Sequence, residues 1–144
     1  MYSGITAGSL FDRTGGGANY ICIPEVPDYH PEATTANNNL AFLYGTEYAM
    51  GTGQALQGYG QQNIPCSVCH VSGRPSQIVI PGTYKCPTTP YNWTVEYTGW
   101  LMSGAYGHKG RTMYTCLDKH PDVIPEYTSV VPGTEGQVSF PQRT

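Results

Sequence analysis

Residues 94–101, TVEYTGWL, alternate between apolar and polar side chains more regularly than any other part of the chain. In a β-strand successive side chains point to opposite faces, so Val95, Tyr97 and Leu101 would share one face while Glu96 and Trp100 share the other. A hydrophobic period of two residues is typical of a strand with one buried face and one solvent-exposed face. This stretch therefore predicts a sheet.

Other short segments rich in β-branched or aromatic residues recur between Gly, Pro and Asn breakers. Together with the first stretch, the expected strands are 20–23, 41–44, 67–71, 77–80, 93–102, 112–117 and 137–140. The connections 29–39 and 50–63 are longer than most loops of compact domains, and such loops commonly hold binding sites. A chain of 144 residues fits one domain. We expect a mainly β fold over residues 1–144: a single compact β-sandwich-like domain with long loops and disulfides.

The composition favours a neutral polar ligand. Only 12% of the residues are charged, whereas about 25% is usual for a soluble domain. Tyrosine outnumbers phenylalanine by 12 to 3, and the tyrosine ring offers an apolar face with a polar tip. The net charge of −3 shows no basic excess, so we expect no nucleic-acid partner. No run of about 18 apolar residues occurs, so we expect no membrane insertion.

The cysteine content indicates a secreted, disulfide-linked domain. The five cysteines are Cys22, Cys66, Cys69, Cys86 and Cys116, in a chain with 12 Pro and 18 Gly. The glycosylation acceptor triplet at 92–94 agrees with export. On a strand, Cys66 and Cys69 would point to opposite faces, so we expect them to reach different partners. The sequence does not choose among the remaining pairings, and the odd thiol could join two subunits.

The motif at 66–70, CSVCH, also matches the attachment site of c-type haem, with Met102 or Met113 as a second axial ligand. Its flanking residues Pro65 and Val71 favour a strand over the helical turn on which that motif sits. A zinc site would need two further ligands at a recognisable spacing, and a redox pair would need a helix N-terminus. We therefore expect structural cysteines here.

Catalytic patterns are weak in this sequence. No G-x-S-x-G elbow is present, and the four histidines have no spacing that defines a triad. Glu47 and Glu96 lie near expected strands but do not otherwise mark a glycosidase pair. We expect no enzymatic activity.

The densest polar cluster runs through residues 106–111 and 118–122, where Gly107 and Gly110 expose the backbone. Its side chains offer hydrogen bonds suited to the hydroxyls of a sugar, while an ordinary solvated hairpin is the alternative. The hydrogen-bonding candidates are His108, Lys109, Arg111, Asp118, His120 and Asp122, and the aromatic rings that could stack on a sugar are Tyr106 and Trp100. Asp118 and Asp122, helped by Glu126 or backbone carbonyls, are also candidate ligands for calcium.

Several motifs also carry a resemblance to a known family. They are SGI at 3–5, GGGANYICIP at 15–24, LYGTEY at 43–48, IPCSVC at 64–69, WTVEYTGWLM at 93–102 and GHKGR at 107–111, followed by CLD at 116–118. This set resembles the C-terminal module of short-chain collagen-like invertebrate proteins and the related galactose-binding lectins of sea anemones and feather stars. The resemblance covers most of the chain, to about residue 122. It implies binding of terminal β-galactose or N-acetyllactosamine, dimerisation and, in some members, calcium. The longer members carry a Cys-rich extension after the position of Phe140, so the resemblance leaves the oligomer and the metal open.

These observations together predict a secreted lectin that binds galactose-terminated glycans of glycoproteins or glycolipids without catalysis. We expect a homodimer, because linking two shallow sites raises avidity without new contacts. The alternative is a structural or adhesion module of the extracellular matrix that has no sugar specificity.

Overall fold

The computed structural model describes residues 1–28, 30, 41, 43–49, 56–60, 62–83, 85–87, 92–124 and 136–138. Of the expected loops, 29–39 lies outside this part of the chain except for His30, and 50–63 lies outside it at residues 50–55 and 61. The strands are β1 (Tyr2–Gly8), β2 (Ile21–Pro24), β3 (Tyr44–Tyr48), β4 (Pro65–Val68), β5 (Gly99–Met102), β6 (Thr115–Asp118) and β7 (Gly136–Val138). The described residues contain no α-helix, and therefore no helix that could span a membrane. The predicted mainly β fold is confirmed.

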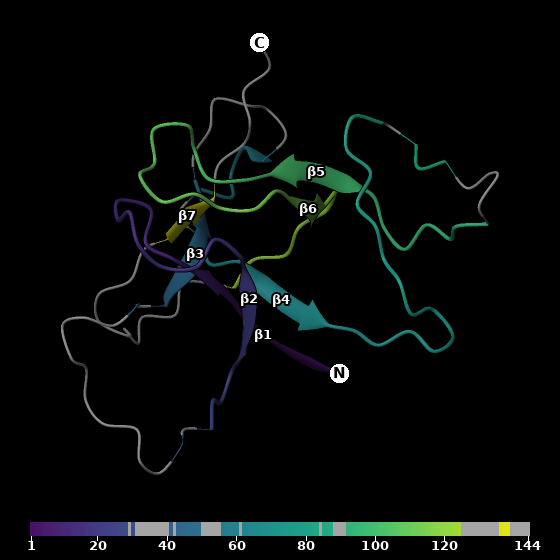
Figure 1. The fold of residues 1–144 in the computed structure, drawn as a ribbon, viewed down its shortest axis with the longest axis horizontal. Coiled ribbons are helices and arrows are strands. Elements are labelled where there is room, and N and C mark those ends of the chain that lie inside the picture. Colours follow the sequence, from purple (N-terminus) through teal and green to yellow (C-terminus); the bar gives the residue numbers. More distant parts are fainter. Residues whose placement is uncertain are drawn as a thin grey trace.

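Strand β1 is the centre of a five-stranded sheet (Figure 1). It pairs antiparallel with β2 through residues 4–7, with β4 through residues 2–5, and with β3 through Ala7 and Gly8. Beyond β3 the sheet ends in β7, which runs parallel to β3. One long strand thus organises segments that are far apart in the sequence.

A disulfide joins β2 to β4 across β1. Cys22 and Cys66 have Cα atoms 5.7 Å apart. In a flat sheet, two strands on opposite sides of a third would lie about twice 4.8 Å apart, so this part of the sheet is strongly curled. Gly4 of β1 allows the curl, because a Cβ at this position would collide with the carbonyl oxygen of Ile23.

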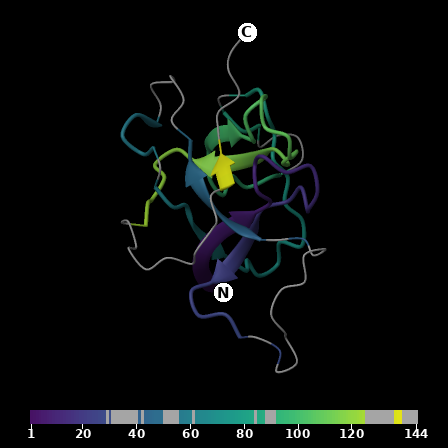
Figure 2. The ribbon, with the colours of Figure 1, turned by 90° about the vertical axis from the view of Figure 1, so that its left-hand side faces the viewer.

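The second layer is the antiparallel ribbon of β5 and β6, in which Gly99 pairs with Asp118 and Met102 with Thr115. It lies beside β3 (Figure 2). Met102 is 1% exposed and shares a small core with Tyr48 of β3, Leu56 and Ile64. Because the ribbon and the sheet bury side chains against each other, the architecture is sandwich-like.

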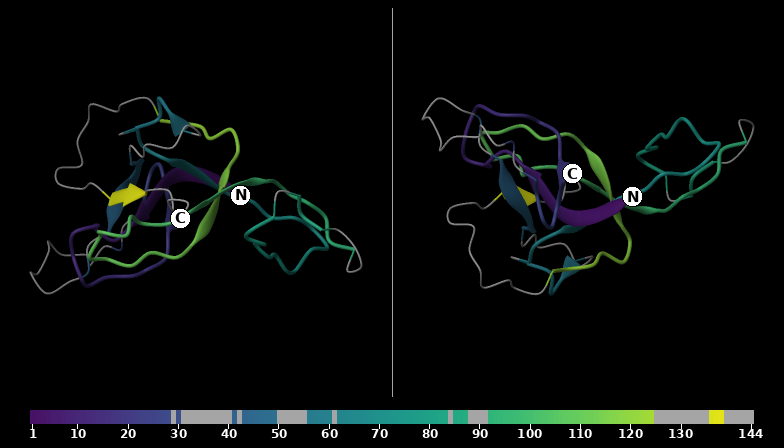
Figure 3. Two further views of the ribbon diagram at one scale, coloured as in Figure 1. Left: turned by 90° about the horizontal axis from the view of Figure 1, so that it is seen from above. Right: turned by 90° about the horizontal axis from the view of Figure 1, so that it is seen from below.

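The described residues 69–83, 85–87 and 92–98 project from the two layers as an arm (Figure 3). The arm leaves at the end of β4 and returns at the start of β5. An ion pair between Arg74 and Glu96 joins its two sides. At the base of the arm, the backbone N–H of Lys119 donates a hydrogen bond to the Thr98 carbonyl at 3.2 Å.

The structure corrects several expected strands. Residues 77–80 form no strand. Residues 93–98 are exposed and pair with no other strand, so the alternating stretch 94–101 becomes a strand only from Gly99. The physical reason is that β6, the partner strand, ends opposite Gly99. Strand β1 was not expected. The expected strand 137–140 overlaps β7, and its last two residues lie outside the described part.

Candidate functional site

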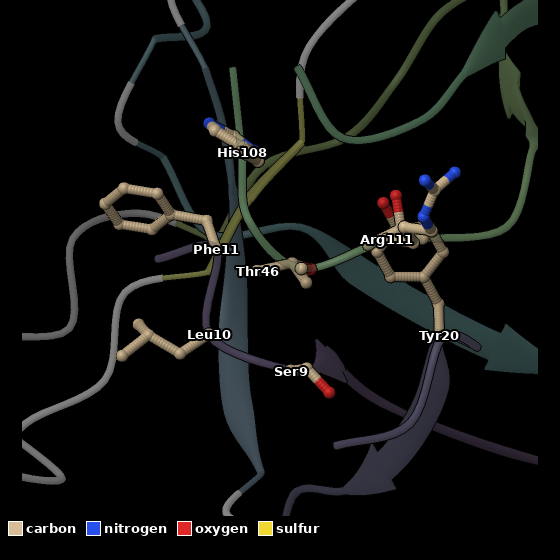
Figure 4. A pocket seen from close by; sticks show the side chains of 9 residues that line it. Ser9, Leu10, Phe11, Tyr20, Thr46, His108 and Arg111 are labelled. Atoms are coloured by element: carbon tan, nitrogen blue, oxygen red, sulfur yellow. The ribbon is translucent and has the colours of Figure 1, made fainter. Parts of the chain in front are cut away.

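Two loops meet beside the sheet to form a small hollow. Residues 9–13 follow β1, and residues 103–114 connect β5 to β6. The Phe11 carbonyl accepts hydrogen bonds from the backbone N–H groups of Lys109 at 3.0 Å and Gly110 at 3.3 Å. A Cβ on Gly110 would lie 2.9 Å from the Arg13 carbonyl oxygen, so this close approach requires glycine. We call this site the loop hollow. Its lining is Ser9, Leu10, Phe11, Tyr20, Thr46, His108, Gly110, Arg111 and Thr112 (Figure 4).

The cavity in the loop hollow has a volume of about 10 Å³. A space of roughly this size holds one water molecule or one hydroxyl group. The site can therefore enclose a single polar group of a ligand, while the rest of the ligand lies on the surface around it.

His108 is fixed and uncharged at neutral pH. Its Nδ1 accepts a hydrogen bond from the Ala105 N–H at 3.2 Å, and its ring lies 5.0 Å from the ring of Phe11. Burial lowers the pKa of the imidazole below 6.5. Because Nδ1 accepts, the proton of the neutral ring is on Nε2. Nε2 is therefore a hydrogen-bond donor.

Tyr20 contributes a buried hydroxyl that makes no hydrogen bond of good geometry among the described residues, although the Thr112 side chain is close enough to interact with it. Burial raises the pKa of the Tyr20 phenol, and the hydrogen-bonding interaction with the Thr112 side chain offsets part of this rise. The Thr112 hydroxyl is already shared with other groups: it accepts from Gly104 N at 2.6 Å and lies 3.1 Å from Ser103 Oγ. A buried polar group left unpaired costs about 1–3 kcal/mol. The Tyr20 hydroxyl would gain this energy from a ligand hydroxyl or a water molecule.

The structure brings only part of the predicted site together. His108 and Arg111 line the loop hollow. Lys109 and Tyr106 are exposed on the same connection, and Tyr106 is 100% exposed. Of these four residues, His108 and Arg111 line the cavity, whereas Lys109 and Tyr106 belong to the same connection without lining it.

The other predicted residues lie elsewhere. The connection 103–114 enters β6 at Thr115, whereas Asp118 is the last residue of β6 and is followed by His120 and Asp122. Asp118 Oδ1 accepts from the His120 N–H at 2.8 Å, and the Asp122 carbonyl accepts from the Tyr48 hydroxyl at 2.9 Å. Trp100 lies on β5 opposite Leu117 and is 39% exposed. Strand β6 therefore separates the two halves of the polar cluster that the sequence predicted as one.

The structure gives no support to a calcium site at Asp118 and Asp122. Within the described ranges, no three His, Cys, Asp or Glu side chains are grouped as metal ligands. Glu126 lies outside those ranges. The haem interpretation of residues 66–70 fails for a different reason, since the Cys66 sulfur is bonded to Cys22.

Sequence reasoning missed Phe11, Tyr20 and Thr112. They come from three separate segments, and no local pattern links them. The one available signal was glycine: Gly110 allows one loop to approach the other.

Comparison of the chain with protein-family models, with curated proteins and with solved structures finds no match.

Proposed function

We propose that this protein is a non-catalytic, secreted lectin whose sugar site is the loop hollow. The observation that carries the proposal is the buried hydroxyl of Tyr20, which lacks a hydrogen bond of good geometry and lies beside a cavity of about 10 Å³. One hydroxyl group of a saccharide matches that cavity in size and hydrogen-bonding capacity.

The surrounding groups suit a neutral ligand. His108 presents an Nε2–H donor, and Arg111 and Lys109 add donors at the rim. Among the described residues, no carboxylate lines the cavity. Galactose-terminated glycans are the expected ligands because of the family resemblance of the sequence. Secretion agrees with the Cys22–Cys66 disulfide, since such bonds persist in oxidising compartments.

Binding is favoured over catalysis by the partners of the hydroxyl groups. Ser9 Oγ donates to the Gly17 carbonyl at 2.5 Å, and Thr112 Oγ1 accepts from Gly104 N. Neither hydroxyl is bonded to a histidine in a way that would activate it as a nucleophile.

The proposal is tested by a glycan array followed by calorimetric titration with lactose and N-acetyllactosamine, each with and without calcium. Tyr20→Phe should keep the fold and weaken binding about tenfold, the loss expected for one buried hydrogen bond. Tyr2→Phe is the matched control, because its hydroxyl bonds to the Cys22 carbonyl in the sheet. No heat from either sugar, or equal affinity of the Tyr20→Phe variant and the unaltered protein, would contradict a sugar site here.

A matrix or adhesion module is the second candidate, favoured by the apolar side chains exposed on the arm and at the start of β5. They are Val71, Ile78, Val79, Trp93, Val95, Tyr97 and Trp100, each at least 38% exposed. Exposed apolar groups in one region commonly mark a contact with another protein. If no glycan on the array is bound and the protein binds a matrix protein saturably, this candidate is favoured.

A further inference from the structure

Three cysteines remain as free thiols beside the Cys22–Cys66 disulfide. Cys69 is exposed at the start of the arm, whereas Cys86 and Cys116 are partly buried. A disulfide-bonded protein folds under conditions that also oxidise neighbouring thiols, so the three are candidates for one further bond. The structure distinguishes the possible pairs.

Cys116 lies on β6 where the returning side of the arm meets the ribbon. Its carbonyl accepts a hydrogen bond from the Tyr97 hydroxyl at 3.0 Å. Three residues further on, Lys119 N donates to the Thr98 carbonyl at 3.2 Å. The base of the arm is therefore fastened to the strand that carries Cys116.

Cys86 lies within the arm, after a turn at Pro81–Gly82 where Gly82 has a φ of 79°. Burial is the main cause that raises the pKa of the Cys116 thiol. The Tyr97 hydrogen bond partly offsets it, and the neighbouring Cys86 and Asp118 raise it further. Because the interaction of two charges weakens with distance, Cys86 is close enough to Cys116 to act on the charge of its thiol.

The described hydrogen bonds between the arm and the ribbon involve Tyr97 and Thr98 at the arm's base. These bonds fasten the arm that carries Cys86 to the strand that carries Cys116, and a disulfide between the two would need Cα atoms within about 7 Å of each other.

We propose that Cys86 and Cys116 form a second disulfide that fastens the arm to β6, and that Cys69 stays outside it. The Cys86 and Cys116 thiols lose two protons and two electrons as the Sγ–Sγ bond forms. The oxidant is the disulfide of an exchange catalyst, which is reduced to two thiols through a mixed disulfide.

The distribution of lysine and arginine allows a direct test. Trypsin does not cut the Arg74–Pro75 bond, so digestion leaves residues 14–85 with Cys22, Cys66 and Cys69 in one peptide. Cys86 falls in peptide 86–109 and Cys116 in peptide 112–119. The full chain, made in the bacterial periplasm, would be alkylated while denatured, digested without reductant and analysed by mass spectrometry.

The expected result is a linked pair of peptides 86–109 and 112–119, with Cys69 either alkylated or joined to Cys69 of a second copy. Cys69→Ser should keep the link. Cys86→Ser should abolish it and leave the Cys116 thiol alkylated, as Cys116→Ser should do for Cys86. A link from peptide 14–85 to either of the other two, or alkylation of Cys86 and Cys116 in the unaltered protein, would overturn the proposal.

Discussion

Gly110 is the residue on which the loop hollow depends. Its backbone N–H bonds to the Phe11 carbonyl, and an added Cβ would lie 2.9 Å from the Arg13 carbonyl oxygen and 3.1 Å from that of Leu10. Both obstacles are backbone atoms, so they cannot turn aside as a flexible side chain would.

We expect Gly110→Ala to separate the two loops and lower the free energy of unfolding by about 1–3 kcal/mol, the usual cost of overpacking. Sugar affinity should fall with it if the loop hollow is the site. Gly107→Ala is the control, because a Cβ there has no heavy atom within 4 Å. Urea unfolding monitored by fluorescence measures both variants. Equal midpoints for the two would show that the loops do not need this close approach.

At the scale of elements, the sequence predicted those strands whose composition is typical of strands. The expected segment 20–23 overlaps β2, and the expected segments 93–102 and 112–117 contain or overlap β5 and β6. Strand β1 escaped prediction because Gly4 and Gly8 weaken its β propensity. Its stability comes from pairing with three other strands, which local sequence does not reveal.

The arm shows the opposite error. Residues 78–80 are apolar and β-branched, and residues 93–98 alternate, yet neither segment is paired with a strand in the described structure. A strand needs an edge to bond with, and the partner β6 ends at Asp118. For the same reason the candidate site was predicted only in part: His108 and Arg111 share a loop, but their neighbours Tyr20 and Phe11 are brought there by the fold of β1 and β2.

The Cys22–Cys66 disulfide should stabilise the curled sheet strongly. It closes a sequence separation of 44 residues, and the loss of unfolded-state entropy for such a loop corresponds to roughly 4 kcal/mol. We expect the double variant Cys22→Ala, Cys66→Ala to lose stability of this order in urea unfolding. Cys69→Ala, which removes an exposed thiol, should change it by less than about 0.5 kcal/mol. Similar stabilities for the two variants would mean that strand pairing alone holds the sheet.

Across the whole molecule, Tyr48 connects the parts that carry the core. It lies on β3 and is 2% exposed, and its ring packs edge-on to Tyr59 at 5.8 Å. Its backbone N–H bonds to the Gln62 carbonyl at 3.1 Å, and its hydroxyl donates to the Asp122 carbonyl at 2.9 Å. One side chain thus joins the central sheet to the segment that follows the ribbon.

Because Tyr48 is buried, we expect the free energy of unfolding to fall at alkaline pH. Burial, followed by the charges of Asp122 and Tyr59, raises the pKa of Tyr48 from 10.0 to about 12. A phenol whose pKa is higher in the folded state contributes stability that is complete below pH 10 and is lost as the pH rises toward 12. The folded protein should therefore lose stability over this range as the phenol is forced to ionise.

Tyr48→Phe separates this effect from general alkaline unfolding. At neutral pH it should cost about 1 kcal/mol, the usual net value of one hydrogen bond. Between pH 10 and 12 its stability should fall less steeply than that of the unaltered protein, because the titrating group is gone. Tyr2→Phe, which removes an exposed hydroxyl bonded to the Cys22 carbonyl, is the matched control. Thermal unfolding at a series of pH values measures all three proteins, and parallel slopes for Tyr48→Phe and the unaltered protein would show that Tyr48 is not the group that couples the two layers to pH.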